Sequence, residues 1–275
     1  LFEGVEGGMA KQQLSWSRWR FDGEVRWLRF FDNRLWLVIA YADGTYSCYV
    51  DLDETVDPAG HRPLLDRAID FPECNYNSSE SDNVSATYDS ATGRTTFVLP
   101  YIPESEVVIV TRFDDPARKG QEIARSSSGQ TLTALGNWTQ SKLTIGCSYE
   151  FRYKFGPTYR QTRNQAGTKM IGDLTGRLQM RRWLINHINT GRYEVDVELK
   201  NRPLTTHVFE ARLLNIDGNQ LDSQGQYLDT GSFGFPIASK STDFAVTLRS
   251  SHWLPVRVSG VTWEGTYTDR ASRNH

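Results

Sequence analysis

Short turn signals divide the first part of this chain at nearly regular intervals. The pairs Asp22-Gly23, Asp32-Asn33 and Asp43-Gly44 lie about ten residues apart, and strand-like segments that mix apolar and polar side chains flank them. Alternation with a period of two is typical of β-strands, and Asp-Gly favours a tight hairpin. The pattern predicts a meander of four antiparallel strands, at residues 15–21, 24–31, 34–41 and 45–52.

A four-stranded sheet of this kind is about the size of one propeller blade. Such a blade buries both faces only when it stacks against neighbouring blades. The sequence also begins at Leu1, with neither an initiator Met nor a secretory signal. We therefore expect a propeller-type blade that belongs to a longer protein.

The rest of the chain shows further strand patterns and no sustained helical periodicity. Strands are predicted at residues 84–88, 95–99, 107–113, 142–146, 149–155, 177–188, 193–199, 208–214, 233–236, 244–249 and 256–263. The strands on either side of Asn189-Thr190-Gly191-Arg192 are expected to pair as a hairpin.

Three polar stretches separate these strands. Residues 53–83 are predicted to be an inserted loop with a short helix at 63–69, and residues 114–130 and 156–176 are expected to be loops. The 8 Trp, 12 Tyr and 13 Phe favour strands over helices. We predict an all-β protein, with propeller-type four-stranded blades over residues 1–113 and an antiparallel, sandwich-like domain over residues 114–275.

Composition excludes several functional classes. The net charge of −2 is unlike that of a general nucleic-acid-binding domain, and the longest apolar stretch, residues 35–41, is too short to span a membrane. The three cysteines and five histidines are scattered, without the spacing of a metal site. We expect no cofactor, no metal and no membrane-spanning segment.

Three acids, Glu194, Asp196 and Glu198, alternate along one predicted strand and so share one face. The pattern resembles the Glu-x-Asp-x-Glu signature of laminarinase-type β-glucanases, which implies Glu194 as nucleophile and Glu198 as acid/base of a retaining reaction. Four strand steps, however, separate the two Cα atoms by about 13 Å. The alternative is a solvent-facing acidic strand that pairs with a basic one containing Arg177, Arg181 and Arg182.

Charge is distributed unevenly along the chain. Residues 150–192 contain nine basic and two acidic side chains, so this segment is +7 and the remainder is −9. Two patches of opposite charge suit a heterologous contact, in which different surfaces of two copies of one chain meet. Candidate inter-subunit or loop contacts are Arg160, Arg163, Lys169, Arg181 and Arg182.

Three stretches resemble one known family, in order and over nearly the whole chain. They begin at Ser15-Trp-Ser-Arg-Trp-Arg-Phe, at Tyr149-Glu-Phe-Arg-Tyr and at Thr230-Gly-Ser-Phe-Gly-Phe-Pro, and the second continues through Gly176-Arg-Leu-Gln-Met-Arg-Arg-Trp. The chain resembles the C-terminal part of the tail tubular protein B, or nozzle, family of short-tailed, podovirus-type bacteriophages.

This resemblance implies a non-enzymatic structural protein of the virion tail, assembled in the host bacterial cytoplasm. It implies a homo-oligomeric ring of six copies below the adaptor ring of tail tubular protein A. Tail fibres or spikes attach to such a ring, and double-stranded DNA passes through it without sequence recognition. An envelope-glycan hydrolase or glycan-binding protein that uses Glu194, Asp196 and Glu198 is the alternative.

Overall fold

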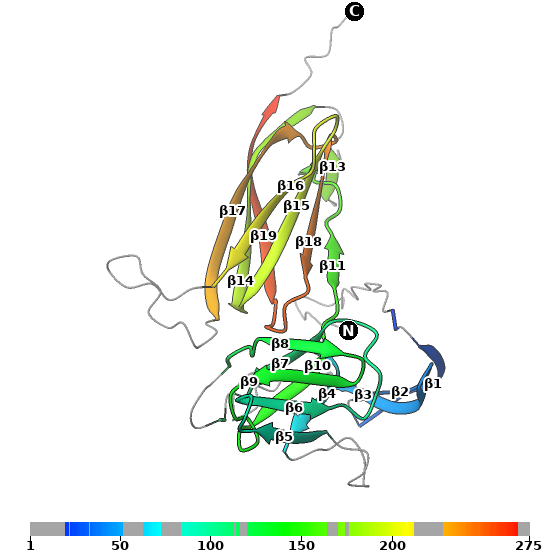
Figure 1. Cartoon of the computed structure of the whole chain (residues 1–275). Coiled ribbons are helices and arrows are strands. Elements are labelled where there is room, and N and C mark those ends of the chain that lie inside the picture. Colours follow the sequence, from blue (N-terminus) through cyan, green and yellow to red (C-terminus); the bar gives the residue numbers. More distant parts are fainter. Residues whose placement is uncertain are drawn as a thin grey trace, which may run out of the picture. The chain divides into compact units, whose positions relative to one another are not determined.

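The computed structural model describes residues 20–21, 23–32, 34–51, 63–72, 84–112, 114–115, 120–163, 170–173, 176–211 and 228–268. These residues form several antiparallel sheets, and none of them lies in a helix (Figure 1). The all-β fold class is therefore confirmed. The propeller stays a prediction, because no sheet among the described residues closes on itself.

The chain divides into two compact units, Leu1–Thr55 and Val56–His275. The domain boundary expected between residues 113 and 114 stays a prediction. In the part of the chain that the structure describes, no helix has the length and hydropathy of a membrane span. The same residues contain no group of three or more His, Cys, Asp or Glu side chains placed to bind a metal ion.

The first unit contains one three-stranded sheet in the order β1-β2-β3. Its strands are β1 (Glu24–Phe31), β2 (Arg34–Tyr41) and β3 (Gly44–Asp51). Three strands of the predicted meander are thus confirmed, whereas most of the first, residues 15–21, falls outside the described residues. Leu37 and Ile39 of β2 are buried, but every residue of β1 is exposed.

The second unit begins with two small sheets, in the orders β4-β10-β7 and β5-β6-β9-β8. Their strands are β4 (Asp66–Phe71), β5 (Ser85–Asp89), β6 (Arg94–Val98), β7 (Val107–Thr111), β8 (Arg125–Ser128), β9 (Thr131–Leu135) and β10 (Leu143–Cys147). The helix expected at residues 63–69 is wrong, because this segment leads into β4, where Ile69 and Phe71 pair with Ile145 and Leu143. Pairing with a distant strand outweighs a weak local preference.

A β-sandwich follows in the same unit, and Figure 1 shows its two sheets face to face. One sheet contains β11 (Phe151–Lys154), β18 (Phe244–Ser250), β15 (Arg192–Leu199) and β16 (Thr205–Glu210), in that order. The other contains β17 (Asp229–Lys240), β14 (Arg177–Thr190) and β19 (Val258–Thr268). Trp183 and Phe235 from one sheet and Val195 and Leu248 from the other share one buried core.

The hairpin expected between β14 and β15 is wrong. β14 already has two hydrogen-bonded neighbours, β17 and β19, so both of its edges are occupied. The chain instead crosses at Gly191 to the opposite sheet, where β15 pairs with β16 and β18. The turn residues signal a reversal of direction, but they do not say in which layer the next strand lies.

The loop expected at residues 156–176 is wrong in part. It contains a short hairpin of β12 (Arg160–Arg163) and β13 (Met170–Asp173), in which Arg160 lies opposite Asp173. The polar stretch 114–130 likewise contains β8, which pairs with β9. Serine-rich and arginine-rich strands of this kind lack the apolar alternation by which strands are recognised.

Candidate functional site

The acidic strand is β15, and two of its three acids are joined to one arginine. Arg249 on β18 lies 2.6 Å from the Glu194 carboxylate and, through Nε, 2.8 Å from that of Asp196. Thr206 on β16 donates a hydrogen bond of 2.7 Å to the other oxygen of Asp196. Glu198 is exposed and lies opposite Ala245. Strands on both sides of β15 therefore hold the Asp196 side chain.

The basic partner of these acids was assigned wrongly from the sequence. Arg177, Arg181 and Arg182 lie on β14, in the opposite sheet, whereas Arg249 lies on β18, directly beside β15. Arg249 follows a strand pattern in the sequence, but only the register of β15 with β18 places it opposite Glu194. The expectation of a solvent-facing acidic strand paired with a basic one is correct only in that the acids contact an arginine on a neighbouring strand: Asp196 is buried, and the arginine is Arg249.

The electrostatics of this strand favour structure over catalysis. Burial acts to raise the pKa of Asp196, but the hydrogen bonds from Thr206 and Arg249 outweigh it, and the pKa lies below its ordinary value. The two carboxyl groups that the glucanase resemblance would use are placed differently: Glu194 is paired with Arg249 at 2.6 Å, and Glu198 is exposed outside this cluster. Arg249 and Thr206 thus keep Asp196 ionised as part of the sheet.

The candidate basic contacts lie in two places. Arg181 and Arg182 are exposed on β14 where its register with both neighbouring strands shifts, which marks a β-bulge. The Arg182 guanidinium lies directly over Gly234, where a Cβ atom would overlap it. Arg160 on β12 lies 4.3 Å from the ring centre of Tyr267. The side chain of Arg163 and the whole of Lys169 lie outside the described residues.

The structure contains a buried histidine network that was not predicted from the sequence. The fully buried His187 on β14 places Nδ1 3.1 Å from the Tyr193 hydroxyl and packs its ring 4.3 Å from that of Phe209. Its Nε2 lies 3.8 Å from Asp229, which is too long for a hydrogen bond. Burial lowers the pKa of His187, against the opposing effect of Asp229. His187 continues the inward alternation of Trp183 and Ile185, which was the available signal.

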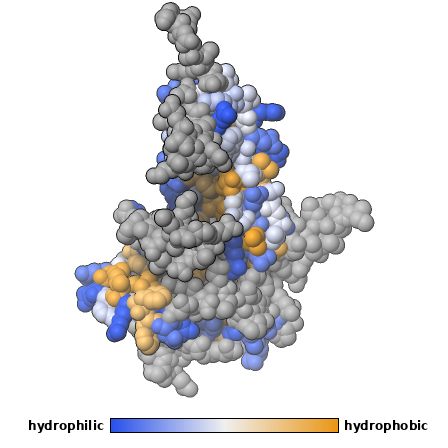
Figure 2. All heavy atoms as spheres, turned by 180° about the vertical axis from the view of Figure 1, so that it is seen from behind, coloured by the Kyte–Doolittle hydropathy of each residue, from blue (hydrophilic) through white to orange (hydrophobic). Residues whose placement is uncertain are grey.

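Within the described residues, β1 lies at the edge of its sheet and presents an apolar surface. Leu28, Phe30 and Phe31 are each about 60% exposed, at 63%, 59% and 63%. Figure 2 shows apolar side chains gathered there, at the lower left of the view. On β1 and β2, Trp27, Phe31 and Trp36 line a pocket of about 330 Å³. Exposed apolar surface of this kind is typical of sites that contact another protein segment.

The antiparallel sheets and the sandwich define an all-β protein. The particular kind follows from comparison with known proteins: the chain belongs to the bacteriophage nozzle protein family, whose sequence model matches residues 4–274. The resemblance inferred from the sequence is therefore confirmed. Membership of this family supports a structural role in the phage tail rather than catalysis.

One curated relative is the tail tubular protein gp12 of Escherichia phage T7. The two sequences are 25% identical over 271 residues, which cover 95% of this chain and 32% of the relative. The chain thus spans about a third of the length of this relative.

Proposed function

We propose that this chain forms part of a ring-shaped nozzle in a phage tail, below the adaptor ring of tail tubular protein A. The observation that carries the proposal is the family match over residues 4–274. By the resemblance described above, the ring contains six copies and is assembled in the host cytoplasm. Double-stranded DNA leaves the virion through it, and tail fibres or spikes attach to it.

A closed ring needs a surface on each copy that meets a different surface of the next copy. Arg181 and Arg182 suit one side of such a contact, because both are exposed and neither has an ion pair within the described residues. The bulge at this point turns two consecutive arginines outward, where a regular strand would expose only one. We propose that they meet an acidic surface of the next copy or of the adaptor.

The passage of DNA sets a second requirement, which concerns the charge of the channel wall. Each phosphate that Lys or Arg neutralises strengthens a salt-dependent attachment, so a lumen through which DNA slides should be neutral or acidic. The segment 156–176, which contains the hairpin of β12 and β13 and carries Arg160, Arg163 and Lys169, is proposed to dock to a neighbour or to narrow the channel. The contact of Arg160 with Tyr267 supports a defined position for one end of it.

The sheet β1-β2-β3 is proposed as one blade of a propeller. Its support is β1, in which every residue is exposed and whose apolar side chains would be covered by the adjoining blade. In this arrangement the pocket between Trp27 and Trp36 receives side chains of that blade.

Negative-stain imaging of the chain, alone and with the adaptor, tests the ring. We expect annular particles with six-fold symmetry, and a loss of at least about tenfold in the assembled fraction when Arg181 and Arg182 are both changed to Glu. Arg94→Glu is the matched control, since Arg94 is an exposed cation of β6. Rings that form equally well with both arginines reversed would remove them from the interface. Wild-type particles without rotational symmetry would reject the ring itself.

A further inference from the structure

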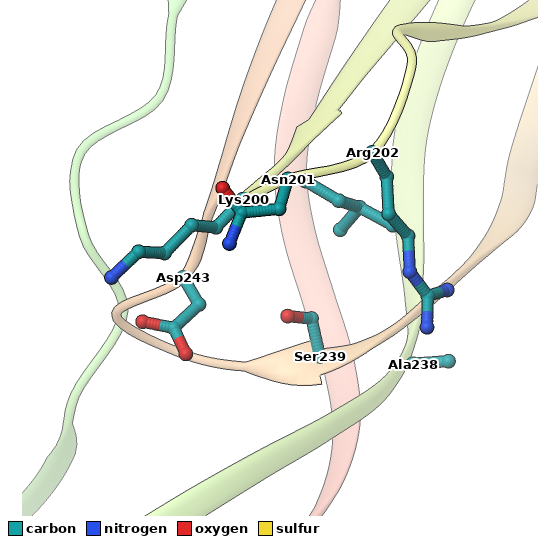
Figure 3. Close-up of a pocket in the computed structure, with 7 residues that line it drawn as sticks. Lys200, Asn201, Arg202, Ala238, Ser239 and Asp243 are labelled. Atoms are coloured by element: carbon teal, nitrogen blue, oxygen red, sulfur yellow. The ribbon is translucent and has the colours of Figure 1, made fainter.

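A polar pocket of about 350 Å³ lies where turns of the two sandwich sheets meet. Lys200, Asn201 and Arg202 line it from the turn between β15 and β16, and Ala238, Ser239 and Asp243 line it from β17 and the following turn. Figure 3 shows Lys200 and Asp243 on one side and Arg202 beside Ala238 on the other. Asn201 and Ser239 lie between them.

Backbone hydrogen bonds fix the frame of this pocket. The Lys200 amide donates to the Asp243 carbonyl at 2.9 Å, which joins the two turns. The Arg202 amide donates to Leu199 at 3.1 Å, and that of Asp243 to Lys240 at 3.0 Å, so each turn is closed on itself. The pocket is therefore formed before any ligand arrives, which lowers the cost of binding.

Two residues of the lining have a left-handed backbone. Asn201 has φ 62° and Ala238 has φ 49°. Asn tolerates this conformation, but the Cβ of Ala makes it unfavourable. Ala238 also lies where β17 shifts its register against β14, between Met180 and Arg182. Backbone strain and strand irregularities concentrate at ligand sites, where the surrounding structure maintains them for function.

The cations of the pocket resemble Arg181 and Arg182, which also form no ion pair within the described residues, and differ from the ion-paired arginines of the second unit. Arg112, Arg125 and Arg249 each form an ion pair at 3.0 Å or less. Within the described residues, Lys200 and Arg202 are exposed and form none. Two cations that the protein leaves unneutralised, beside a preformed polar pocket, indicate an anionic ligand.

We propose that this pocket binds an acidic saccharide. The anionic group of the sugar, a carboxylate or a phosphate, pairs with the guanidinium of Arg202 and with Lys200. The sugar hydroxyl groups donate to the Asp243 carboxylate and exchange hydrogen bonds with Asn201 and Ser239. Asp243 discriminates between classes of ligand. Its carboxylate repels an anion that has no hydrogen-bond donor, and duplex DNA has no free hydroxyl group along its backbone that could donate to this carboxylate.

Ligand-observed NMR with the full chain tests this proposal at low salt. The probes are trigalacturonate, glucose 6-phosphate, neutral maltotriose and a short DNA duplex. We expect trigalacturonate or glucose 6-phosphate to bind, with the tighter of the two identifying the anionic group. Maltotriose and the duplex should bind at least about tenfold more weakly, as expected for ligands without the charge-assisted pair or without hydroxyl donors.

The variants separate this pocket from general electrostatic attraction. Arg202→Ala should weaken the acidic probe about tenfold or more, Arg202→Lys should weaken it less, and Arg94→Ala on β6 should leave it unchanged. Thermal unfolding confirms that each variant is folded. Equal binding of maltotriose, duplex DNA as tight as the acidic saccharides, or an Arg202→Ala chain that binds as the wild type does would each overturn the proposal.

Discussion

The guanidinium of Arg249 lies 2.6 Å from the carboxylate of Glu194, and the two residues are direct partners in the register of β18 with β15. Because of this pair, we interpret Glu194, the first acid of the apparent catalytic signature, as part of a cross-strand ion pair. The same guanidinium also reaches Asp196, whose side chain is only 8% exposed. Glu194 and Asp196 thus hold a central strand to its neighbour, in keeping with a structural protein.

Replacing Arg249 with Leu should destabilise the sandwich by about 3 kcal/mol, because the carboxylate of Asp196 would stay buried without its charged partner. Urea unfolding measures this change. Arg192→Ala is the control: Arg192 lies 3.5 Å from Glu194 with 40% of its side chain exposed, so its loss should cost less than about 1 kcal/mol. Equal effects of the two substitutions would contradict the special role of Arg249.

Acid should weaken the fold through two histidines, the buried His187 and the half-buried His252. Burial lowers the pKa of both His187 and His252 in the folded chain. The unfolded chain then binds more protons, so the stability is fully present above the ordinary histidine pKa of about 6.5 and is lost as the pH falls below it. We expect a lower melting temperature at about pH 5.5 than at about pH 7.5.

His187→Phe isolates one of these two groups. Phenylalanine keeps an aromatic ring against Tyr193 and Phe209 and removes the titrating ring, although the Tyr193 hydroxyl loses its partner. The variant should therefore be less stable near neutral pH, yet lose less on acidification than the wild type. A melting temperature that falls by the same amount in both proteins would show that His187 does not titrate in this range.

The sequence allowed most strands to be predicted, because alternation and turn residues are local properties. The register and layer of each strand are not local. Nothing around Asn189 and Gly191 shows that both edges of β14 are already paired, and nothing near Glu194 identifies Arg249 as its partner. The family resemblance rested on local motifs as well, and the pocket at Lys200 and Ala238 became visible only when two turns were placed together.

Gly191 tests the crossing between the two sheets. Its amide donates to the Pro255 carbonyl at 3.1 Å, and an added Cβ atom would overlap the side chain of Leu254. Gly191→Ala should cost about 1 to 3 kcal/mol, as other insertions into a packed site do. At Gly260 a Cβ atom would meet nothing within 4 Å, so Gly260→Ala is the matched control. Differential scanning calorimetry compares them, and similar melting temperatures would refute the tight crossing.

The connection between β18 and β19 holds the sandwich against the strands that precede it, and Trp253 is its central contact. The buried indole packs with Val108, Val110 and Leu254, and its Nε1 donates to Glu122 at 3.2 Å. The Trp253 carbonyl accepts a hydrogen bond of 2.7 Å from the Leu64 amide. One residue therefore joins three segments that are far apart in the sequence.

Trp253→Ala should cost about 3 to 5 kcal/mol, because it leaves a cavity in this cluster and an uncovered Val108 and Val110. Trp253→Phe keeps most of the apolar contact and loses only the hydrogen bond to Glu122, so its cost should be near 1 kcal/mol. Limited proteolysis of the folded variants locates the effect: the alanine variant should be cleaved faster between the sandwich and the preceding sheets, while the phenylalanine variant resembles the wild type. If both variants unfold and are cleaved alike, the hydrogen bond to Glu122 rather than the packing of the indole maintains the junction.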